Sequence, residues 1–230
     1  MGLEVAVPDV NTAQMNYYPD IKSGDRSPRI VYGLSAIRNV GEGIVSLLIS
    51  ERNSNGPFVD FYDFCERVDL QVLNRRAIEA LIKAGAFDSL GHTRQGLLAS
   101  YEQIIEQTVS RRREKEMGVM TLFEVAPDDA SQVFDDKILI PEIEFEKQQR
   151  LSFEKEMLGR YISDHPLRGY EGTLRRKCDA TSQGVSSLDE GKVIKVGGVI
   201  TEVNKKQTQR GDLMATISLE DLEGEIEVIV

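Results

Sequence analysis

Apolar residues recur every three or four positions between residues 31 and 117, a spacing that predicts a helical domain. The clearest apolar face consists of Ile78, Leu81 and Ile82, and Gly85 follows it as a helix-ending residue. The predicted helices are a short one ending near Arg38 and longer ones over residues 42–52, 74–84 and 93–117.

The segments on either side of this domain lack its periodicity. Residues 1–30 are punctuated by prolines and predict an irregular lead-in, which we interpret as the tail of an upstream domain. Residues 118–145 are acidic and aperiodic and predict a flexible linker. Residues 146–180 predict a helical connector, because the helical pattern resumes there and then breaks at "SDHPL".

From Gly191 onward the apolar period changes to two, which predicts strands. The chain turns near Gly211, and the pair Gly197-Gly198 predicts a bulge or bend in the first strand. This antiparallel meander, over residues 181–230, fits the first half of a small β-barrel of the OB type. The barrel is expected to be truncated, because the chain ends inside a strand. The predicted fold class is therefore α+β: helices, a flexible acidic linker, then part of a barrel.

Charge is unevenly distributed along the 230 residues, whose formal net charge is -10 at pH 7. Residues 71–115 carry 8 Lys and Arg against 5 Asp and Glu, so one basic island lies in an acidic chain. Long-range attraction to DNA is therefore expected to be weak, and any contact with nucleic acid has to be local.

Composition also excludes several classes of protein. No apolar run is long enough to cross a bilayer, and the first residues have neither the basic nor the apolar region of a signal peptide. Cys65 and Cys178 are far apart, and His92 and His165 are the only histidines, so neither a zinc site nor a disulfide is expected. We expect a cytoplasmic chain that holds no metal or cofactor of its own.

The motif "RNVGEG" interrupts the helical pattern, which then resumes at once. Two helices joined by a glycine turn expose the first N–H groups of the second helix, where the helix dipole favours an anion. Because glycine has no Cβ, a phosphate can approach this backbone, as in a helix-hairpin-helix motif. We therefore place Arg38, Asn39, Gly41 and Gly43 at a site that binds DNA phosphates without reading bases. The alternative is an ordinary turn, and Glu42 would repel a phosphate unless its carboxylate points away.

A second helix–turn–helix unit is predicted over residues 78–99. Two such units in tandem would hold both strands of a duplex across a minor groove. The alternative interpretation of His92 and Arg94 is a solvated helix start. The candidate DNA contacts of the second unit are Lys83, Gly91, His92, Thr93 and Arg94.

Five segments, in sequence order, give the chain a resemblance to a known family: "PDVN", "IVYGLSAIRNVGEG", "LNRRAIEALIKAGAFDSLG", "FEKEMLGRYISDHPL" and "RGDLMATISLEDLEGEIEVIV". Together they resemble the C-terminal half of the bacterial C-family replicative polymerases, the DNA polymerase III alpha subunits, from about Pro8 to Val230. The resemblance implies four parts. These are the tail of a fingers domain (1–30), a tandem helix-hairpin-helix domain on duplex DNA (31–117), a clamp-binding peptide in the linker, and the start of an OB domain near single-stranded template.

The resemblance also implies where the chemistry lies. In this family two-metal nucleotidyl transfer depends on palm-domain aspartates upstream of the matched region, so no catalytic residue is expected in this chain. The full protein is expected to be a Mg²⁺-dependent DNA-directed DNA polymerase, whereas this chain alone is not expected to polymerise DNA. Its implied partners are duplex DNA at the primer-template, single-stranded template, the sliding clamp and other polymerase III holoenzyme subunits.

The family's clamp-binding peptide has a Gln, a spacer and a Leu/Met-Phe pair. Here it matches Met120, Leu122 and Phe123 in the linker, a setting that suits a peptide that orders on binding. Val119 stands at the Gln position, so affinity for the clamp is expected to be lower than that of a full motif. The alternative is that Leu122 and Phe123 pack back onto the domain.

The OB segment implies one further nucleic-acid contact. Its predicted strands carry no aromatic residue for base stacking, so any binding of a single strand has to come from cations. The cations of the predicted loop between the first two strands are Lys205, Lys206 and Arg210.

Two alternative functions stay open at this point. An OB-fold protein of the tRNA-synthetase type would explain the strands but not "RNVGEG" or "LIKAGAFDSLG". A non-catalytic interaction module would treat both hairpins as ordinary turns and the acidic linker as a docking segment. Preference for duplex DNA over tRNA separates the first alternative, and loss of all DNA affinity at low salt would favour the second.

Overall fold

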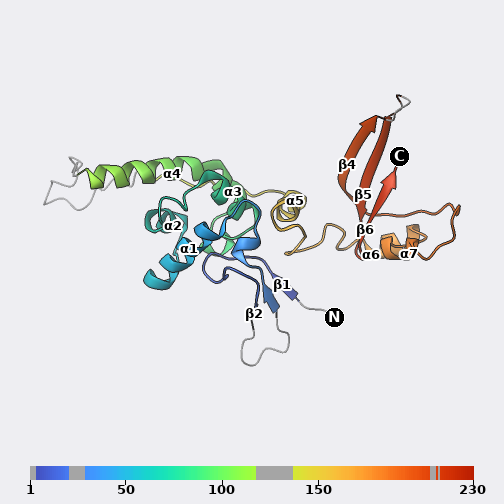
Figure 1. The fold of residues 1–230 in the computed structure, drawn as a ribbon, viewed down its shortest axis with the longest axis horizontal. Coiled ribbons are helices and arrows are strands. Elements are labelled where there is room, and N and C mark those ends of the chain that lie inside the picture. The colour runs from blue at the N-terminus through green and yellow to red at the C-terminus, as the bar shows by residue number, and fades with distance from the viewer. Residues whose placement is uncertain (1–3, 21–28, 118–136, 208–210, 212) are drawn as a thin grey trace. The chain divides into compact units, whose positions relative to one another are not determined.

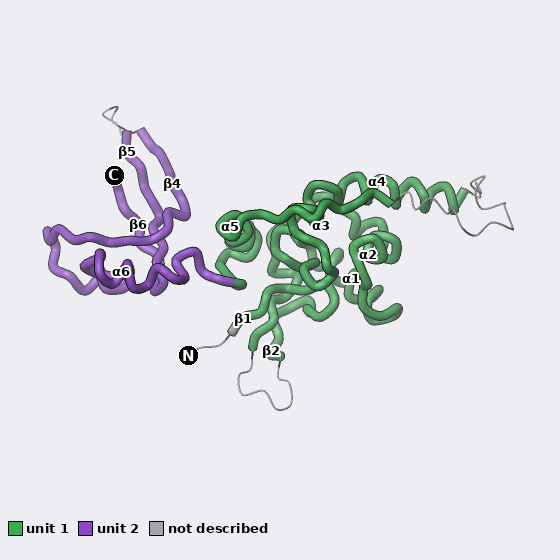
Figure 2. The backbone as a smooth tube through the Cα atoms, turned by 180° about the vertical axis from the view of Figure 1, so that it is seen from behind, with its two compact units in different colours: residues 1–163 green, residues 164–230 purple. Residues whose placement is uncertain are grey.

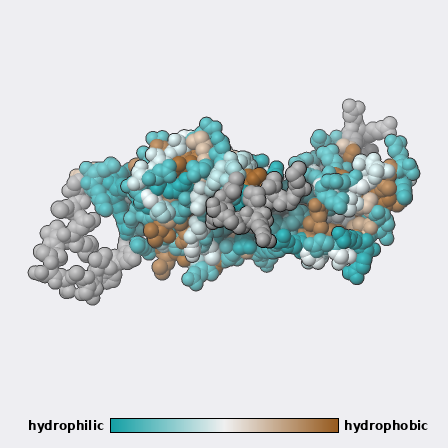
Figure 3. All heavy atoms as spheres, turned by 90° about the horizontal axis from the view of Figure 1, so that it is seen from below, coloured by the Kyte–Doolittle hydropathy of each residue, from teal (hydrophilic) through white to brown (hydrophobic). Residues whose placement is uncertain are grey.

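The computed structural model describes residues 4–20, 29–117, 137–207, 211 and 213–230. The chain divides into two compact units, residues 1–163 and residues 164–230, shown in different colours in Figure 2. The face drawn in Figure 3 is mostly hydrophilic, and its hydrophobic residues occur in small separate patches. None of the described helices is long and apolar enough to cross a membrane.

Unit 1 is built mainly from helices (Figure 1). The helices predicted over 42–52, 74–84 and 93–117 are confirmed to within a few residues. The short helix expected to end near Arg38 is only a 3₁₀ turn, and a helix after "RNSNGPF" was not predicted. The helical elements are η1 (Leu34–Ala36), α1 (Glu42–Asn55), α2 (Phe61–Arg67), α3 (Arg75–Lys83), η2 (Asp88–Leu90), α4 (Arg94–Glu116) and α5 (Lys147–Leu158).

The helix ends follow from local side-chain chemistry. Asn74 begins α3, because its side chain accepts hydrogen bonds from the N–H groups of Arg76 and Ala77. Gly85, with φ of 82°, lets the chain leave α3 in a left-handed conformation. The C-terminal end of α2 is closed from a distance, since Arg112 of α4 donates hydrogen bonds to carbonyl oxygens there at 2.7 and 2.8 Å.

Phenylalanines form the centre of the hydrophobic core of unit 1. The ring of Phe64 meets the rings of Phe58 and Phe87 edge-on, with centroids 5.0 and 4.9 Å apart. Phe61 also meets Phe87 edge-on at 5.2 Å, and all four side chains are buried. Edge-to-face pairs of this kind add to the stabilisation gained from area burial alone. The aromatic cluster thus holds α2 against the turn that follows α3.

The lead-in is part of unit 1 and not a separate tail, which corrects the boundary expected at residue 30. Val10 and Ala13 are completely buried, and the Asn11 side chain exchanges two hydrogen bonds with the backbone of Phe58. Since these residues lack helical periodicity, only their long-range contacts reveal that they belong to the core. The segment forms a three-stranded sheet of order β1-β3-β2, with β1 (Glu4–Ala6), β2 (Tyr18–Asp20) and β3 (Arg29–Val31).

The region after α4 is also more integrated than predicted. We call residues 137–145 the strap. Ile138 and Ile140 of the strap pack against the core, and the hydroxyl of Tyr62 donates to Ile138 O at 2.5 Å. Met157 and Leu158 of α5 are buried in the same core. The predicted flexible linker is therefore wrong for the strap, while residues 118–136 lie outside the described part of the chain.

Unit 2 contains the predicted antiparallel meander. Its elements are α6 (Glu171–Lys177), α7 (Ser182–Val185), β4 (Val199–Gln207), β5 (Leu213–Glu220) and β6 (Glu225–Ile229), with the strands in the order β4-β5-β6. The fold class α+β is confirmed, but the described strands form an open three-stranded sheet and no closed barrel.

The glycines of unit 2 that were expected to bend the first strand have another role. The register shift in β4 lies between Ile200 and Glu202, and not at the predicted Gly197-Gly198. A Cβ on Gly198 would lie 2.5 Å from Glu220 O, so this residue is small because the next strand passes close by. Gly211, with φ of 91°, lies at the predicted turn between β4 and β5.

Candidate nucleic-acid interface

The first hairpin is a tight turn between η1 and α1. Two short backbone hydrogen-bonded turns, Ile37 N to Leu34 O and Val40 N to Ile37 O, compact the chain before the helix. Asn39 adopts φ of 67°, a left-handed conformation that Asn tolerates better than most residues. Gly41 then precedes α1 in extended conformation (φ -79°, ψ 151°). The turn thus points the N-terminal end of α1 outward, with residues 41–43 exposed.

The first N–H groups of α1 are unpaired among the described residues. Gly41 has no side chain to cap the helix, and the first intrahelical bond that closes on it comes from Val45 N. The N–H groups of Glu42, Gly43 and Ile44 therefore have no acceptor in the described part of the chain. Together with the positive end of the helix dipole, these donors favour an anion at this position.

The fold itself does not require glycine at positions 41 and 43. A Cβ built on either residue would meet no heavy atom within 4 Å, and neither residue has a positive φ. Gly33, a few residues earlier, is different, because a Cβ there would lie 2.5 Å from the backbone of Asn16. The bare backbone at Gly41 and Gly43 therefore leaves room on the outside of the molecule.

The hairpin is held firmly by the rest of unit 1. The N–H of Arg38 donates to Met157 O at 3.0 Å, and the hydroxyl of Tyr32 donates to Leu158 O at 2.8 Å. These bonds place the C-terminal end of α5 beside the turn. Burial raises the pKa of Tyr32, and the nearby positive charge of Arg160 acts in the opposite direction.

The exposed Arg160 is a candidate cation that sequence reasoning missed. It lies far from "RNVGEG" in the sequence, in the helical connector, and only the packing of α5 on the turn brings it near. The only local feature that could have marked Arg160 as exposed is its position directly after Gly159, a helix-ending glycine with φ of 75°. Arg38, Asn39, Gly41 and Gly43, by contrast, are neighbours in the sequence and lie in one turn, where all four are exposed.

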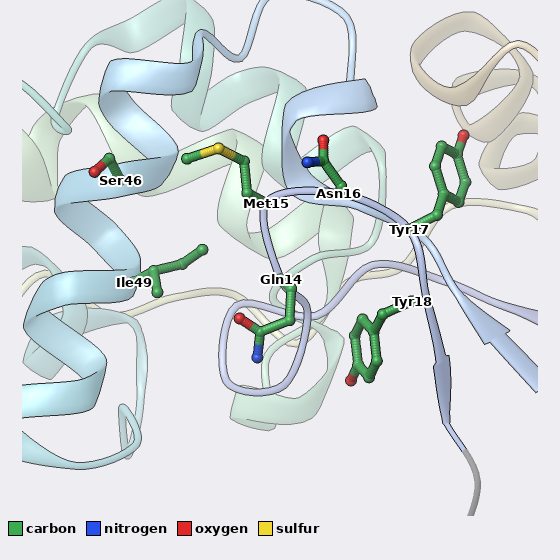
Figure 4. A pocket seen from close by; sticks show the side chains of 7 residues that line it. All are labelled: Gln14, Met15, Asn16, Tyr17, Tyr18, Ser46 and Ile49. Atoms are coloured by element: carbon green, nitrogen blue, oxygen red, sulfur yellow. The ribbon is translucent and has the colours of Figure 1, made fainter.

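A hollow of about 410 Å³ lies beside the first hairpin, between α1 and the loop before β2 (Figure 4). The loop is held against the start of the hairpin, because Leu34 N and Ser35 N donate to Gln14 O and Met15 O. In Figure 4 Ile49 projects from α1 toward the loop that carries Gln14 and Met15, and Ser46 lies on the same helix. None of the described residues that line the hollow is charged, so it offers no competing charge next to the hairpin. Its lining residues are Gln14, Met15, Asn16, Tyr17, Tyr18, Ser46 and Ile49.

The second hairpin is occupied by the protein itself. Thr93 caps α4 by accepting a hydrogen bond from Gly96 N, and its hydroxyl donates to Ile143 O of the strap at 2.5 Å. The carboxylate of Glu144 accepts from Arg94 N at 3.3 Å and from Gln95 N at 3.4 Å. Two backbone donors at the start of α4, Arg94 N and Gln95 N, are therefore paired with a carboxylate.

Arg94 is not the free cation that the sequence predicted. Its side chain is 5% exposed and forms ion pairs with Asp88 at 2.7 Å and with Glu154 at 3.1 Å. Burial lowers the pKa of this guanidinium, but the hydrogen bonds and charges of both carboxylates outweigh burial and raise it. We correct the expectation accordingly: in this structure Arg94 joins the second hairpin to α5.

Of the other candidate contacts of the second unit, the side chain of Lys83 is engaged and that of His92 is partly covered, while Gly91 is exposed. Lys83 forms an ion pair with Glu79 at 2.8 Å and lies 5.1 Å from the ring centre of Phe153, with its side chain 17% exposed. His92 lies edge-on to Tyr62 and has a buried Nε2 without a hydrogen bond in the described structure. Gly91 is exposed and has φ of 80°. The structure thus separates the two hairpins into one that is open and one that is covered.

The remaining predicted site residues lie elsewhere. Lys205 and Lys206 belong to strand β4 and not to a loop, where they pair with Ala215 and Met214. Consecutive strand residues point to opposite faces, so these two lysines cannot act together on one face. Four more fall outside the described residues: Met120, Leu122, Phe123 and Arg210.

The described residues contain no group of three or more His, Cys, Asp or Glu side chains that could hold a metal ion. Of the two free cysteines, Cys65 is buried in the core, and burial raises the pKa of its thiol. Neither cysteine takes part in the hairpins.

Comparison with known proteins shows which family the chain is similar to. A family model described as "Helix-hairpin-helix motif" matches residues 2–97, which include both hairpins. The chain is 36% identical over its whole length to a DNA polymerase III subunit alpha of Mycobacterium tuberculosis, of which it covers 19%. It is 34% identical to the corresponding subunit of Pseudomonas aeruginosa (99% of this chain, 20% of that protein) and 31% identical to that of Vibrio cholerae (100% and 19%). The chain thus spans about a fifth of the length of these relatives, and over its whole length it is similar to bacterial DNA polymerase III alpha subunits.

Proposed function

We propose that this chain is the part of a DNA polymerase III alpha subunit that holds duplex DNA by its backbone. The observation that carries the proposal is the open N-terminal end of α1. Three N–H groups, at residues 42–44, lack acceptors among the described residues, and two glycines that the fold does not require keep the approach to them clear. A phosphate group supplies oxygen acceptors and a negative charge, which are what this position lacks.

The charges around the first hairpin fit a local, sequence-independent contact. Arg38 and Arg160 are exposed and form no ion pair with the described residues, so both are free to contact phosphates on either side of the turn. Asn39 adds an uncharged donor. Contacts of this kind position a duplex but do not read its sequence. Because the chain as a whole is acidic, we expect modest affinity and a shallow salt dependence.

Changing Gly41 and Gly43 together to alanine tests this proposal. We expect the double variant to bind a labelled DNA duplex at least about tenfold more weakly, a loss of roughly 1.4 kcal/mol. The reason is that two methyl groups would then lie where the phosphate approaches. Folding should suffer little, since both methyl groups would enter open space. Alanine favours the helix at position 43, which offsets its poorer capping of α1 at position 41. Fluorescence anisotropy across a salt series measures the binding.

Gly172→Ala is the matched control, because Gly172 is an exposed helical glycine in α6 with equally open surroundings. It should leave DNA affinity unchanged. Equal affinities of the wild type, the double variant and this control would show that the first hairpin is only a turn. Absence of any binding at low salt would favour the interaction module over DNA binding.

Glu42→Gln is a second test, in which the change is expected to strengthen DNA binding. The carboxylate of Glu42 is exposed in the first turn of α1, and no described residue neutralises it. Removing its charge should strengthen duplex binding by about 0.3–1 kcal/mol, or roughly two- to fivefold. Glu66→Gln, at an exposed position of α2, removes the same charge away from the hairpin. If both changes strengthen binding to the same extent, the effect comes from net charge and not from the hairpin.

The proposal for the whole protein goes further. The names of the relatives support a full-length protein that is a DNA polymerase and assembles with other subunits. The family resemblance adds DNA-templated synthesis in the cytoplasm, with Mg²⁺ held outside this chain. The family resemblance supports a clamp-binding peptide at Met120, Leu122 and Phe123. It also supports an OB domain in unit 2 that contacts single-stranded template, through Arg210 and either Lys205 or Lys206, since the two lysines lie on opposite faces of β4. The tRNA-synthetase alternative gains no support from these relatives.

A further inference from the structure

The two hairpins differ in what lies on the N-terminal end of their second helix. At α1 the N–H groups of Glu42 and Gly43 have no acceptor among the described residues. At α4 the N–H groups of Arg94 and Gln95 both point to the carboxylate of Glu144, which is about 50 residues further along the chain. A third donor to this carboxylate is Phe145 N, at 2.7 Å, in the strap itself. The second hairpin therefore already holds an oxyanion.

The backbone of the strap is fixed, but the Glu144 side chain is not. The carbonyl oxygen of Pro141 lies so close to α4 that a Cβ on Gly96 would be 2.1 Å from it. Thr93 and Tyr62 donate hydrogen bonds to strap carbonyls, and the Ile side chains of the strap pack on the core. Glu144, however, is exposed, and its bonds to α4 are long for hydrogen bonds to a charged group. Its carboxylate can therefore leave the helix without moving the strap.

We propose that Glu144 occupies the position of a DNA phosphate on the second hairpin and exchanges with that phosphate when duplex DNA binds. This inference rests on the proposed function, because it needs a duplex held at the first hairpin. The observation that points to an oxyanion site here is the Glu144 carboxylate, which accepts hydrogen bonds from Arg94 N and Gln95 N at the α4 end. This turn also lies within residues 2–97, the stretch that matches the helix-hairpin-helix model.

The exchange has a simple physical basis. A carboxylate and a phosphate both present oxygen acceptors to the same backbone donors, and like charges prevent both from staying. The freed carboxylate would enter solvent, where an exposed charge is well hydrated. The chain would thus contact DNA through the first hairpin alone until a phosphate displaces Glu144, and through both hairpins afterwards. Because the phosphate has to displace Glu144, we expect the second hairpin to bind DNA more weakly than the open first hairpin does.

The test compares Glu144→Gln with Glu142→Gln on the full chain. Both residues are exposed in the strap, so each change removes one negative charge from the same segment, but Glu142 does not contact α4. We expect Glu144→Gln to bind a labelled duplex at least about threefold more tightly than Glu142→Gln. Glutamine keeps an oxygen that can cap α4, so the fold is preserved.

A measurement on the unmodified chain accompanies the variants. In nitrogen-15 NMR spectra, the amide signals of Arg94 and Gln95 should shift when duplex DNA is added, because their acceptor changes from carboxylate to phosphate. Unchanged Arg94 and Gln95 signals together with equal affinities of Glu144→Gln and Glu142→Gln would overturn the proposal and leave Glu144 as a helix cap only.

The two proposals fail in different ways. Repeating the pair in the Gly41→Ala, Gly43→Ala background separates them. If the first hairpin does not bind DNA, the glycine changes have no effect in any background. If only the Glu144 proposal fails, the glycine changes still weaken binding, while the two strap variants remain equal to each other.

Discussion

Replacing Arg94 with methionine is expected to lower the free energy of unfolding of unit 1 by about 3–5 kcal/mol. Methionine has a similar length but no charge, so the change removes the partner of a buried carboxylate. The side chain of Glu154 is only 1% exposed, and one of its oxygens accepts hydrogen bonds from the N–H groups of Ile162 and Ser163. Urea unfolding followed by circular dichroism at 222 nm, where the helices of unit 1 dominate, measures the loss.

Two further variants show that the cause is the unpaired buried charge. Arg113→Met, at an exposed position of the same helix, should change stability little. Adding Glu154→Gln to Arg94→Met should recover part of the loss, since glutamine is uncharged but still accepts from the two N–H groups. A full loss in the double variant would mean that the packing of Arg94, and not its charge, stabilises this region.

Gly33→Ala is expected to destabilise unit 1 by about 2–3 kcal/mol, a far larger loss than the same change at Gly41 or Gly43. The atoms nearest to an added Cβ are the backbone carbon atoms of Asn16 at 2.5 and 2.7 Å and the Met15 oxygen at 2.7 Å. Backbone atoms cannot rotate away as a flexible side chain can, so the loop before β2 has to move off the hairpin. The same urea experiment measures the change.

Gly43→Ala is the control for this prediction, because it adds the same methyl group where nothing lies within 4 Å. In the first turn of α1 this change should be neutral or stabilising by up to about 1 kcal/mol. A small effect of Gly33→Ala would show that the loop at residues 14–16 is loosely attached. The boundary of unit 1 would then have to be moved back toward residue 30.

These contrasts give the glycines of the first hairpin different roles. Gly33 is required from inside, by the loop that packs on it, whereas Gly41 and Gly43 are required by nothing within the described chain. Gly41 has the ordinary role of a helix N-cap residue, and binding of a DNA phosphate is the reason that we propose for the bare backbone at both positions. The same reasoning separates the two hairpins, since only the second has an acceptor of its own in Glu144.

Local signals in the sequence determined most of the helices of unit 1 and the meander of unit 2. Asn74 and Thr93 cap α3 and α4 through bonds to residues two or three positions away, and Gly85 ends α3 by its own backbone conformation. The motif at Gly41 and Gly43 likewise marks the open end of α1. Such features depend on a few neighbouring residues, so they can be recognised without knowing the fold. The whole-chain family resemblance was also readable, because it rests on the order of short segments.

Tertiary structure alone decided which of the predicted contacts are free. Arg94 and Glu154 are 60 residues apart, Glu144 is 50 residues from the α4 end, and Asn11 is 47 residues from Phe58. An exposed arginine and a buried, ion-paired arginine look the same in the sequence. Only tertiary packing determines whether the arginine has a carboxylate partner. The lead-in and the strap were missed for the same reason: they have no periodicity, and their apolar residues find their places only on a surface that other segments build. Local patterns thus determined where the hairpins are, and long-range burial and charge pairing decided that one hairpin is open and the other is covered.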